Sequence, residues 1–344
     1  MHLKSDVSRN VAAIFIGLFI AIISAILIDR TFAWSMNIKV SRSNFFAKSD
    51  DLDGLGWSAR NERKLKKTDS GYSVNQKEVF DDNVVFDVTY NFDSLYRRRV
   101  QEIPLENTGN FAIFFGDSQT FGEGLNDKDT IPAIFQTNTS SYRVYNYAYK
   151  GYGPHQMLKK LETHSLSNEI AEKKGVAFFQ YFDFHMQRVI GSMSYISWAG
   201  GGAPYYGISA EDQLEYLGSF ATGRFFRTLL YWLLSKSAIA NYYQVDLPKQ
   251  ITQQHFDLFC RVLEKSRSIF LAQYPGSRFV VIVGMTNSET DTIIQECLTK
   301  NDIEYIDMRG LDKNAQGLQF PHNGHFTPKA SLLIAQQLIP LIGK

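Results

Sequence analysis

An uncharged apolar run near the N-terminus constrains this 344-residue chain more than any other feature. Residues 11–28 read VAAIFIGLFIAIISAILI, without one charged side chain. As a helix, these 18 residues would span about 27 Å, close to the ~30 Å hydrocarbon thickness of a bilayer. A core helix normally keeps a polar face, and a signal-peptide core is shorter, about 7–15 residues. No clear A-x-A cleavage site follows, so we predict an uncleaved membrane anchor; a cleaved signal peptide is the alternative.

The charges beside this run do not decide how it is inserted. Lys4 and Arg9 precede it, and Arg30, Lys39 and Arg42 follow it, so neither side has the cationic excess that marks the cytoplasm. Large domains are also translocated largely regardless of such charges. The orientation must therefore be inferred from the rest of the chain.

A second apolar stretch, residues 225–239, is of a different kind. It carries Arg227, Ser235 and Lys236. These side chains fit an amphipathic or buried helix better than a second membrane span.

Composition excludes several classes of protein. The chain has 36 Lys+Arg against 35 Asp+Glu, which argues against nucleic acid as the main partner, because binding phosphates needs a positive excess. With 44% apolar residues it can bury a sizeable core. Its two cysteines, Cys260 and Cys297, make neither a disulfide framework nor a four-ligand zinc site, and whether they pair stays open.

The sequence pattern of the chain changes at about residue 107. Residues 29–106 are polar, with one strand-like pattern (VVFDVTY), and predict a stem with short β-strands. Residues 107–344 alternate short apolar runs with helical patterns, interrupted by an insertion at about 191–245. This alternation predicts an α/β domain, a parallel sheet with helices on both faces and ligands beyond the carboxyl ends of the strands. The expected strands are 111–115, 142–147, 176–182, 279–284 and 304–308, and the expected helices are 130–137, 154–164, 253–274, 290–298 and 328–341.

The first of these strands leads directly into a serine turn. FAIFF is followed by GDSQTFG, which places Ser118 just past a buried strand and between glycines. Such a serine can present its hydroxyl as a nucleophile at the sheet edge, with its backbone N–H as an oxyanion donor. The alternative is an ordinary helix N-cap.

Two further loops are expected at the same edge. The segment NYAYKGYGP follows the second strand, and its Gly151 allows close backbone approach to a ligand. The segment HNGHFTP precedes the last helix and carries His325, which could reach Ser118 as a general base. Taken singly, a glycine turn and a lone histidine are more often structural, so the argument depends on their combination.

These three elements together resemble the SGNH/GDSL hydrolase family over roughly two-thirds of the chain, from Phe111 to the C-terminus. Ser118 in its GDS turn matches the nucleophile of the first block. Asn146 and Gly151 match the second block, whose glycine N–H is an oxyanion donor, and His325 matches the base of the last block. The resemblance implies an SGNH-like, flavodoxin-like three-layer fold with a five-stranded parallel sheet, after one N-terminal transmembrane helix.

The sequence departs from the family in the third block, which normally reads Gly-x-Asn-Asp and supplies an Asn donor to the oxyanion hole. Here Phe182 stands at the Asn position and cannot donate a hydrogen bond. Losing such a donor typically costs ~10²–10³ in rate; His185 or Arg188 could substitute. Asp117, Asp183 and His185 are candidates for oxyanion or substrate contacts, with a helix cap as the alternative for Asp183 and a surface position for His185.

The last block departs as well. Its usual Asp, two or three residues before the histidine, is replaced by Asn323 and His322. An Asn can orient the ring of His325, but it cannot stabilise an imidazolium by charge. A Ser-His dyad supported by a backbone carbonyl, or an approach of Asp307, are the other possibilities.

The resemblance implies a membrane-anchored serine esterase or O-acyltransferase without metal or organic cofactor, acting on acyl esters, acetyl first among them, of an envelope glycan or lipid. We expect residues 1–10 to be a cytoplasmic tail, residues 11–28 to bind the membrane, and the main domain to lie outside the cytoplasm, on the periplasmic side if the cell is Gram-negative. The two departures support an alternative: a catalytically weak or inactive SGNH-like protein that binds glycan or scaffolds an envelope assembly.

Overall fold

The main domain is built on a five-stranded parallel sheet. The computed structural model describes residues 2–38, 45, 65–104, 109–283, 289–308 and 317–342. The spatial order of the strands is β5-β4-β6-β9-β10, which is 2-1-3-4-5 when they are numbered along the chain, the flavodoxin-like order. The strands are β4 (Asn110–Phe115), β5 (Tyr142–Asn146), β6 (Lys174–Gln180), β9 (Arg278–Val283) and β10 (Glu304–Asp307). The predicted fold class is therefore confirmed.

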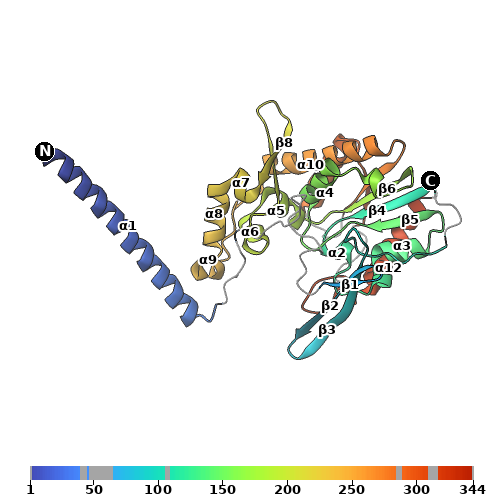
Figure 1. The fold of residues 1–344 in the computed structure, drawn as a ribbon, viewed down its shortest axis with the longest axis horizontal. Coiled ribbons are helices and arrows are strands. Elements are labelled where there is room, and N and C mark those ends of the chain that lie inside the picture. The colour runs from blue at the N-terminus through green and yellow to red at the C-terminus, as the bar shows by residue number, and fades with distance from the viewer. Residues whose placement is uncertain are drawn as a thin grey trace.

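Helices cover both faces of this sheet (Figure 1). Alternate residues of β4 enter different cores: Ile113 and Phe115 pack on one side, Ala112 and Phe114 on the other. This explains why residues 111–115 of β4 are all apolar. The first face carries α4 (Pro154–Thr163), α10 (Gln253–Gln273) and α11 (Glu289–Lys300); the second carries α3 (Ile131–Thr137) and α12 (Pro328–Leu338).

A three-stranded antiparallel sheet from the N-terminal region packs against the main domain. It comprises β1 (Lys66–Thr68), β2 (Gly71–Phe80) and β3 (Asn83–Phe92), and we call it the hairpin after its two long strands, β2 and β3. The buried Tyr90 and Phe92 of β3 contact Phe121 of the short helix α2 (Ser118–Phe121). The hairpin therefore lies directly beside the turn that carries Ser118.

The insertion forms a small subdomain at the side of the sheet domain (Figure 1). It follows α5 (Phe184–Ile190) and has a core of its own around Ile196 and Phe220. Its elements are α6 (Met193–Ala199), β7 (Pro204–Ile208), β8 (Leu214–Ser219), α7 (Phe220–Gly223), α8 (Phe225–Leu234) and α9 (Ala238–Tyr242).

The N-terminal helix α1 (His2–Ser35) projects away from the domain (Figure 1). Its segment Ala13–Ser35 has a mean hydropathy of 2.3 over its most apolar window and is not buried by the protein. The helix is thus long and apolar enough to cross a membrane.

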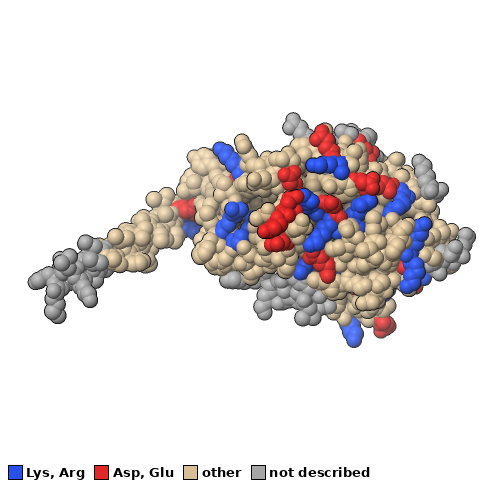
Figure 2. Space-filling view, turned by 90° about the horizontal axis from the view of Figure 1, so that it is seen from above, with Lys and Arg blue, Asp and Glu red and all other residues tan. Residues whose placement is uncertain are grey.

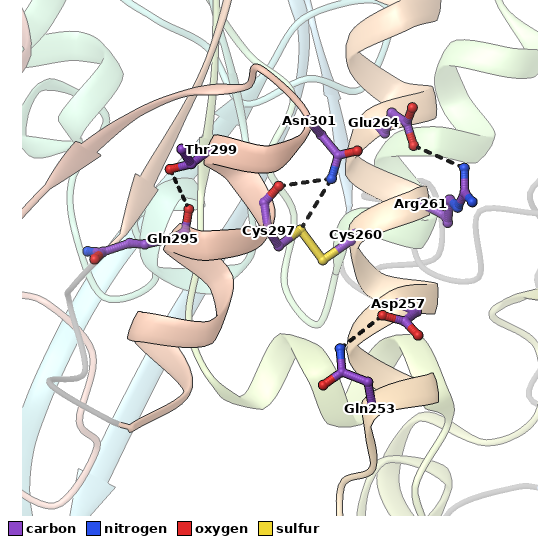
Figure 3. The surroundings of a disulfide bond; sticks show 9 residues. All are labelled: Gln253, Asp257, Cys260, Arg261, Glu264, Gln295, Cys297, Thr299 and Asn301. Carbon is purple, nitrogen blue, oxygen red and sulfur yellow. Dashed lines mark hydrogen bonds and ion pairs between the residues drawn. A yellow bond between two sulfur atoms is a disulfide. The ribbon is translucent and has the colours of Figure 1, made fainter.

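The remaining described elements are the short 3-10 helices η2 (Asp127–Asp129), η3 (Leu166–Asn168) and η4 (Ile339–Leu341). A disulfide joins Cys260 of α10 to Cys297 of α11 (Figure 3), which answers the question that the sequence left open. On the face shown in Figure 2, basic and acidic side chains are interspersed, without a large patch of one sign.

Candidate active site

The Ser118 turn is shaped by close backbone packing. Ser118 is the first residue of α2, and Asp117 is its N-cap, whose Oδ1 accepts a hydrogen bond of 3.0 Å from the Gln119 N–H. Gly116 is required because a Cβ there would lie 2.3 Å from Thr120 Oγ1. The strand, the glycine and the cap together leave Ser118 only partly buried at the carboxyl edge of the sheet.

The structure brings Ser118 and His325 into contact. Their Oγ and Nε2 atoms are 2.8 Å apart, although 207 residues separate them in the chain. Gln119 fixes the two loops to each other: its Nε2 donates to the Gly324 carbonyl (3.2 Å) and its Oε1 accepts from the Phe326 N–H (2.9 Å). The pair is therefore held by hydrogen bonds on both sides of the histidine.

Asn323 stands where the Asp of the family block would be. Its Oδ1 contacts His325 Nδ1 and accepts from the His325 backbone N–H (3.1 Å). Its Nδ2 donates a 2.6 Å hydrogen bond to Glu78 Oε2 of strand β2. Because the Glu78 carboxylate only accepts, it fixes the amide with its oxygen toward the ring. Nδ1 must then carry the ring proton, which leaves Nε2 free to accept the proton of Ser118.

A second carboxylate lies beside the other ring nitrogen. Glu123 Oε2 is 3.4 Å from His325 Nε2. Its other oxygen accepts from Gln76 Nε2 (3.1 Å), and Gln76 in turn contacts Lys150 (3.2 Å). The ring thus has a carboxylate near Nε2 and, through an amide, a second one behind Nδ1.

Gly151 lies beside Trp198 of the insertion. Its φ of +79° is favourable for glycine, and a Cβ would lie 3.0 Å from the Trp198 ring. In the described part of the chain, we find no hydrogen bond that uses the backbone N–H of Ser118 or Gly151. Both groups therefore keep the capacity expected of oxyanion donors.

Behind the nucleophile lies a buried cluster of Asp117, His185 and Arg188. Asp117 Oδ2 is 3.3 Å from Arg188 Nη1 and 3.5 Å from His185 Nε2. Burial alone would raise the pKa of the Asp117 carboxyl, but His185, Arg188 and the Gln119 N–H together lower it. Burial lowers the pKa of His185, although Asp117 opposes this. The cluster is a charged support under the Ser118 turn.

The third-block residues have structural contacts. Phe182 is buried, packing on Phe184 and Phe326. Asp183 caps α5 by accepting a 2.8 Å hydrogen bond from the Phe184 N–H. His185 is fully buried, so the surface position considered for it is wrong; its Nδ1 accepts from the Phe182 N–H (3.1 Å).

Arg188 and Asp307 have other partners. Arg188 Nη1 also donates to the Tyr152 carbonyl, next to Gly151. Asp307 accepts from Gln295 Nε2 (3.1 Å). The group at His325 Nδ1 is Asn323.

Sequence reasoning did not select Glu78, Glu123 or Gln119. Glu78 contacts a residue 245 positions away, and the sequence pattern of its region predicts only a stem. Glu123 and Gln119 lie within the motif, but no pattern distinguishes them from ordinary polar helix residues. Trp198 lies in the insertion, where no motif in the sequence marks it as part of the site.

The described elements give this chain an SGNH/GDSL hydrolase-like fold: a 2-1-3-4-5 parallel sheet with a serine after its first strand and a histidine before its last α-helix. No protein-family model matches the chain, and no curated protein matches it.

Among solved structures, similar folds include a lipolytic G-D-S-L-family protein from Veillonella parvula (10% identity, TM-score 0.41, covering 68% of this chain and 99% of that one). A lipase/acylhydrolase from Enterococcus faecalis has 13% identity and a TM-score of 0.38, covering 68% and 95%. An acetyl xylan esterase from Butyrivibrio proteoclasticus has 9% identity and a TM-score of 0.39, covering 72% and 66%. Likeness at this level carries no argument about activity, so the chemistry must be argued from the site itself.

Proposed function

We propose that this protein is a membrane-anchored serine ester hydrolase or O-acyltransferase. Its substrates would be acyl esters, acetyl esters first among them, on an envelope glycan or lipid. The observation that carries the proposal is the 2.8 Å contact between Ser118 Oγ and His325 Nε2. A serine in hydrogen-bond reach of a base that is itself oriented by a third group is the arrangement of an activated nucleophile.

The chemistry follows from the contacts. Ser118 Oγ attacks the ester carbonyl while its proton passes to His325 Nε2, and the oxyanion accepts hydrogen bonds from the N–H groups of Ser118 and Gly151. The imidazolium is stabilised by Glu123 directly and by Glu78 through the Asn323 amide. The proton then goes to the departing alkoxide, and water or a sugar hydroxyl, deprotonated by His325, releases the acyl group from Ser118.

Phe182 favours the alternative of a catalytically weak, glycan-binding protein. It leaves the oxyanion hole without the side-chain donor of the family block, a deficit of ~10²–10³ in rate. Arg188 Nη1 already contacts Asp117 and the Tyr152 carbonyl, so it would have to leave these partners to act as the donor. We therefore propose an enzyme with a low turnover rather than an inactive one, because nucleophile, base and orienting groups are all in contact.

Trp198 supports a carbohydrate substrate. Its ring lies next to Gly151, and the residue is 48% exposed. An exposed aromatic face beside the oxyanion position offers a sugar ring a stacking surface.

The disulfide supports a location outside the cytoplasm. Disulfides persist in oxidising compartments and are rare in the cytosol. The Cys260–Cys297 bond joins two helices of the main domain, so we place this domain on the outer side of the membrane, with residues 1–10 in the cytoplasm.

A fluorophosphonate probe tests the proposal on the full-length protein in detergent. Wild type should be labelled, whereas Ser118→Ala and His325→Ala should not be, and the exposed Ser167→Ala serves as the matched control that keeps its labelling. If folded wild type is not labelled but still binds acetylated glycan, the binding-protein alternative is correct. Mass spectrometry of a sugar acceptor incubated with an acetyl ester then separates transfer from hydrolysis.

A further inference from the structure

Helix α8 exposes an apolar stripe. Phe226, Leu230 and Leu233 are spaced i, i+4, i+7, so they share one helix face, and they are 84%, 51% and 52% exposed. The opposite face is covered, since Thr228 is buried and Tyr231 and Trp232 pack against α6 and its neighbours. A ten-residue helix with this division presents three large apolar side chains outward.

This stripe is held beside the end of the membrane-spanning helix. Asp29 of α1 caps α9: its carboxylate accepts hydrogen bonds from Ser237 Oγ (2.7 Å) and from the N–H groups of Ala238 (3.0 Å) and Ile239 (3.1 Å). Phe32 of α1 also packs edge-to-face on Tyr242 at 5.4 Å. Since only Ser235 to Ser237 separate α8 from α9, the cap fixes α8 relative to α1.

Aromatic side chains surround this junction. Trp34 of α1 is 85% exposed, and Tyr242 and Tyr243 of α9 are 48% and 69% exposed. Trp and Tyr are enriched where a protein passes through the bilayer–water interface. Figure 1 shows α8 and α9 at the end of the domain that faces α1, and in Figure 2 the surface next to α1 is mostly uncharged.

We propose that α8 and α9 form a second membrane contact, with the stripe of Phe226, Leu230 and Leu233 immersed in the outer surface of the same bilayer that α1 crosses. Ten residues of helix reach only about 15 Å, too short to span, so α8 lies in the interface. The occupant is a lipid bilayer, because α1 already brings one to this position. The inference rests on the anchoring part of the proposed function and is independent of the ester chemistry.

The contact would orient the domain. α8 packs on α6, and α6 carries Trp198 beside Gly151. A single layer of helix therefore separates the lipid-facing stripe from the wall of the candidate active site. A domain held only by α1 could rotate about its anchor, whereas two contacts fix which side of the active site faces the membrane.

The test uses full-length protein in phosphatidylcholine vesicles with nitroxide lipids. Phe226→Cys, Phe19→Cys and Leu332→Cys are labelled with an environment-sensitive fluorophore; the native cysteines are joined in the disulfide. Phe19 in α1 reports spanning, and Leu332 on α12, 43% exposed, is the matched control for an exposed apolar position far from α1. Since position 226 is exposed, the substitution leaves the fold intact.

We expect a shallow nitroxide to quench the label at position 226, aqueous iodide to quench it little, and the reverse at position 332. Quenching by iodide to the same extent at both positions overturns the proposal. Protection of position 226 from both quenchers also overturns it, because the stripe would then be covered by protein, such as a second copy. A label at position 19 that escapes a deep nitroxide refutes the anchoring itself, which separates that failure from a failure of the α8 contact.

Discussion

Substituting Asn323 and Glu78, the polar residues on the Nδ1 side of His325, gives the most discriminating test of the site. If Asn323 merely replaced the missing Asp, Asn323→Asp would recreate a Ser-His-Asp triad. Replacing the Asp of such a triad by Asn lowers the rate about 10⁴-fold, so Asn323→Asp would then raise the rate strongly. Glu78 leads to a different expectation, because its Oε2 lies 2.6 Å from Asn323 Nδ2.

The distance sets the magnitude. Two carboxylate oxygens 2.6 Å apart would repel by about 6 kcal/mol at an effective dielectric constant of 20, before any relaxation. One carboxyl of the pair would take up a proton, as in other paired carboxylates. The protonated group resembles the amide that it replaces, and the pair keeps its single negative charge. We therefore expect Asn323→Asp alone to change kcat/KM little near neutral pH.

Glu78→Gln should lower activity by itself. It exchanges a charge-assisted hydrogen bond for a neutral one, a difference of about 1 kcal/mol, or roughly fivefold in rate. The double variant Asn323→Asp/Glu78→Gln restores one negative charge next to His325 and gives it an amide donor, so its kcat/KM should equal or exceed that of wild type. The two substitutions are thus strongly non-additive.

The assay is hydrolysis of a chromogenic acetate ester by the full-length protein in detergent. Asp87→Asn is the matched control, since it removes a carboxylate of the same hairpin that pairs with Lys77 rather than with the His325 loop, and it should leave kcat/KM unchanged. A gain of about 10² or more from Asn323→Asp alone, with no loss from Glu78→Gln, would show that Glu78 is not coupled to the base.

Three further changes test the site and its frame. Gly151→Ala should lower kcat/KM about 10²–10³-fold through a displaced oxyanion donor, because its φ is +79° and the new Cβ would press on Trp198; a normal rate would exclude Gly151 as a donor. Burial lowers the pKa of His155 well below its usual value, so below about pH 6.5 the unfolded chain binds a proton that the native state does not. The free energy of unfolding therefore decreases as the pH is lowered, by up to about 1.4 kcal/mol per pH unit. His155→Phe should reduce this fall in urea unfolding at pH 7.5 and 5.5, and an unchanged fall would contradict the assignment. Replacing Cys260 and Cys297 by Ala opens a loop with a sequence separation of 37, which should cost about 2–4 kcal/mol of unfolding free energy; an unchanged unfolding curve would show that the bond adds nothing.

The sheet could be predicted from the sequence because burial of a strand on both faces produces a continuous run of apolar residues. Strands β4, β6 and β9 are buried on both faces, so they read as uninterrupted apolar runs such as FAIFF and FVVIV. The observed strand and helix ends lie within a few residues of the expected ones. Ser118 could be selected because its GDS turn directly follows such a strand. His325 could be selected because its loop precedes the last helix and, together with the GDS turn and Gly151, resembles the blocks of the SGNH/GDSL family.

The groups behind the base could not be predicted in this way. Glu78 lies on a hairpin with partly polar alternation, and its role depends on a contact across 245 residues. His185 illustrates the converse. It is a candidate oxyanion or substrate contact in the sequence, with a surface position as the alternative, yet it is fully buried, with Asp117 and the Phe182 N–H beside it in the interior. Both cases depend on contacts between residues far apart in the sequence, which no local sequence pattern predicts.

The site is therefore shared among segments that the sequence separates. Ser118 and His325 belong to the sheet domain, Glu78 to the N-terminal hairpin and Trp198 to the insertion. The insertion in turn holds α1 through Asp29. A change in the hairpin can thus act on the base, and a change in α1 can act on the wall of the candidate site. Because each segment contributes a contact that the others lack, the N-terminal region and the insertion both contribute to the candidate active site.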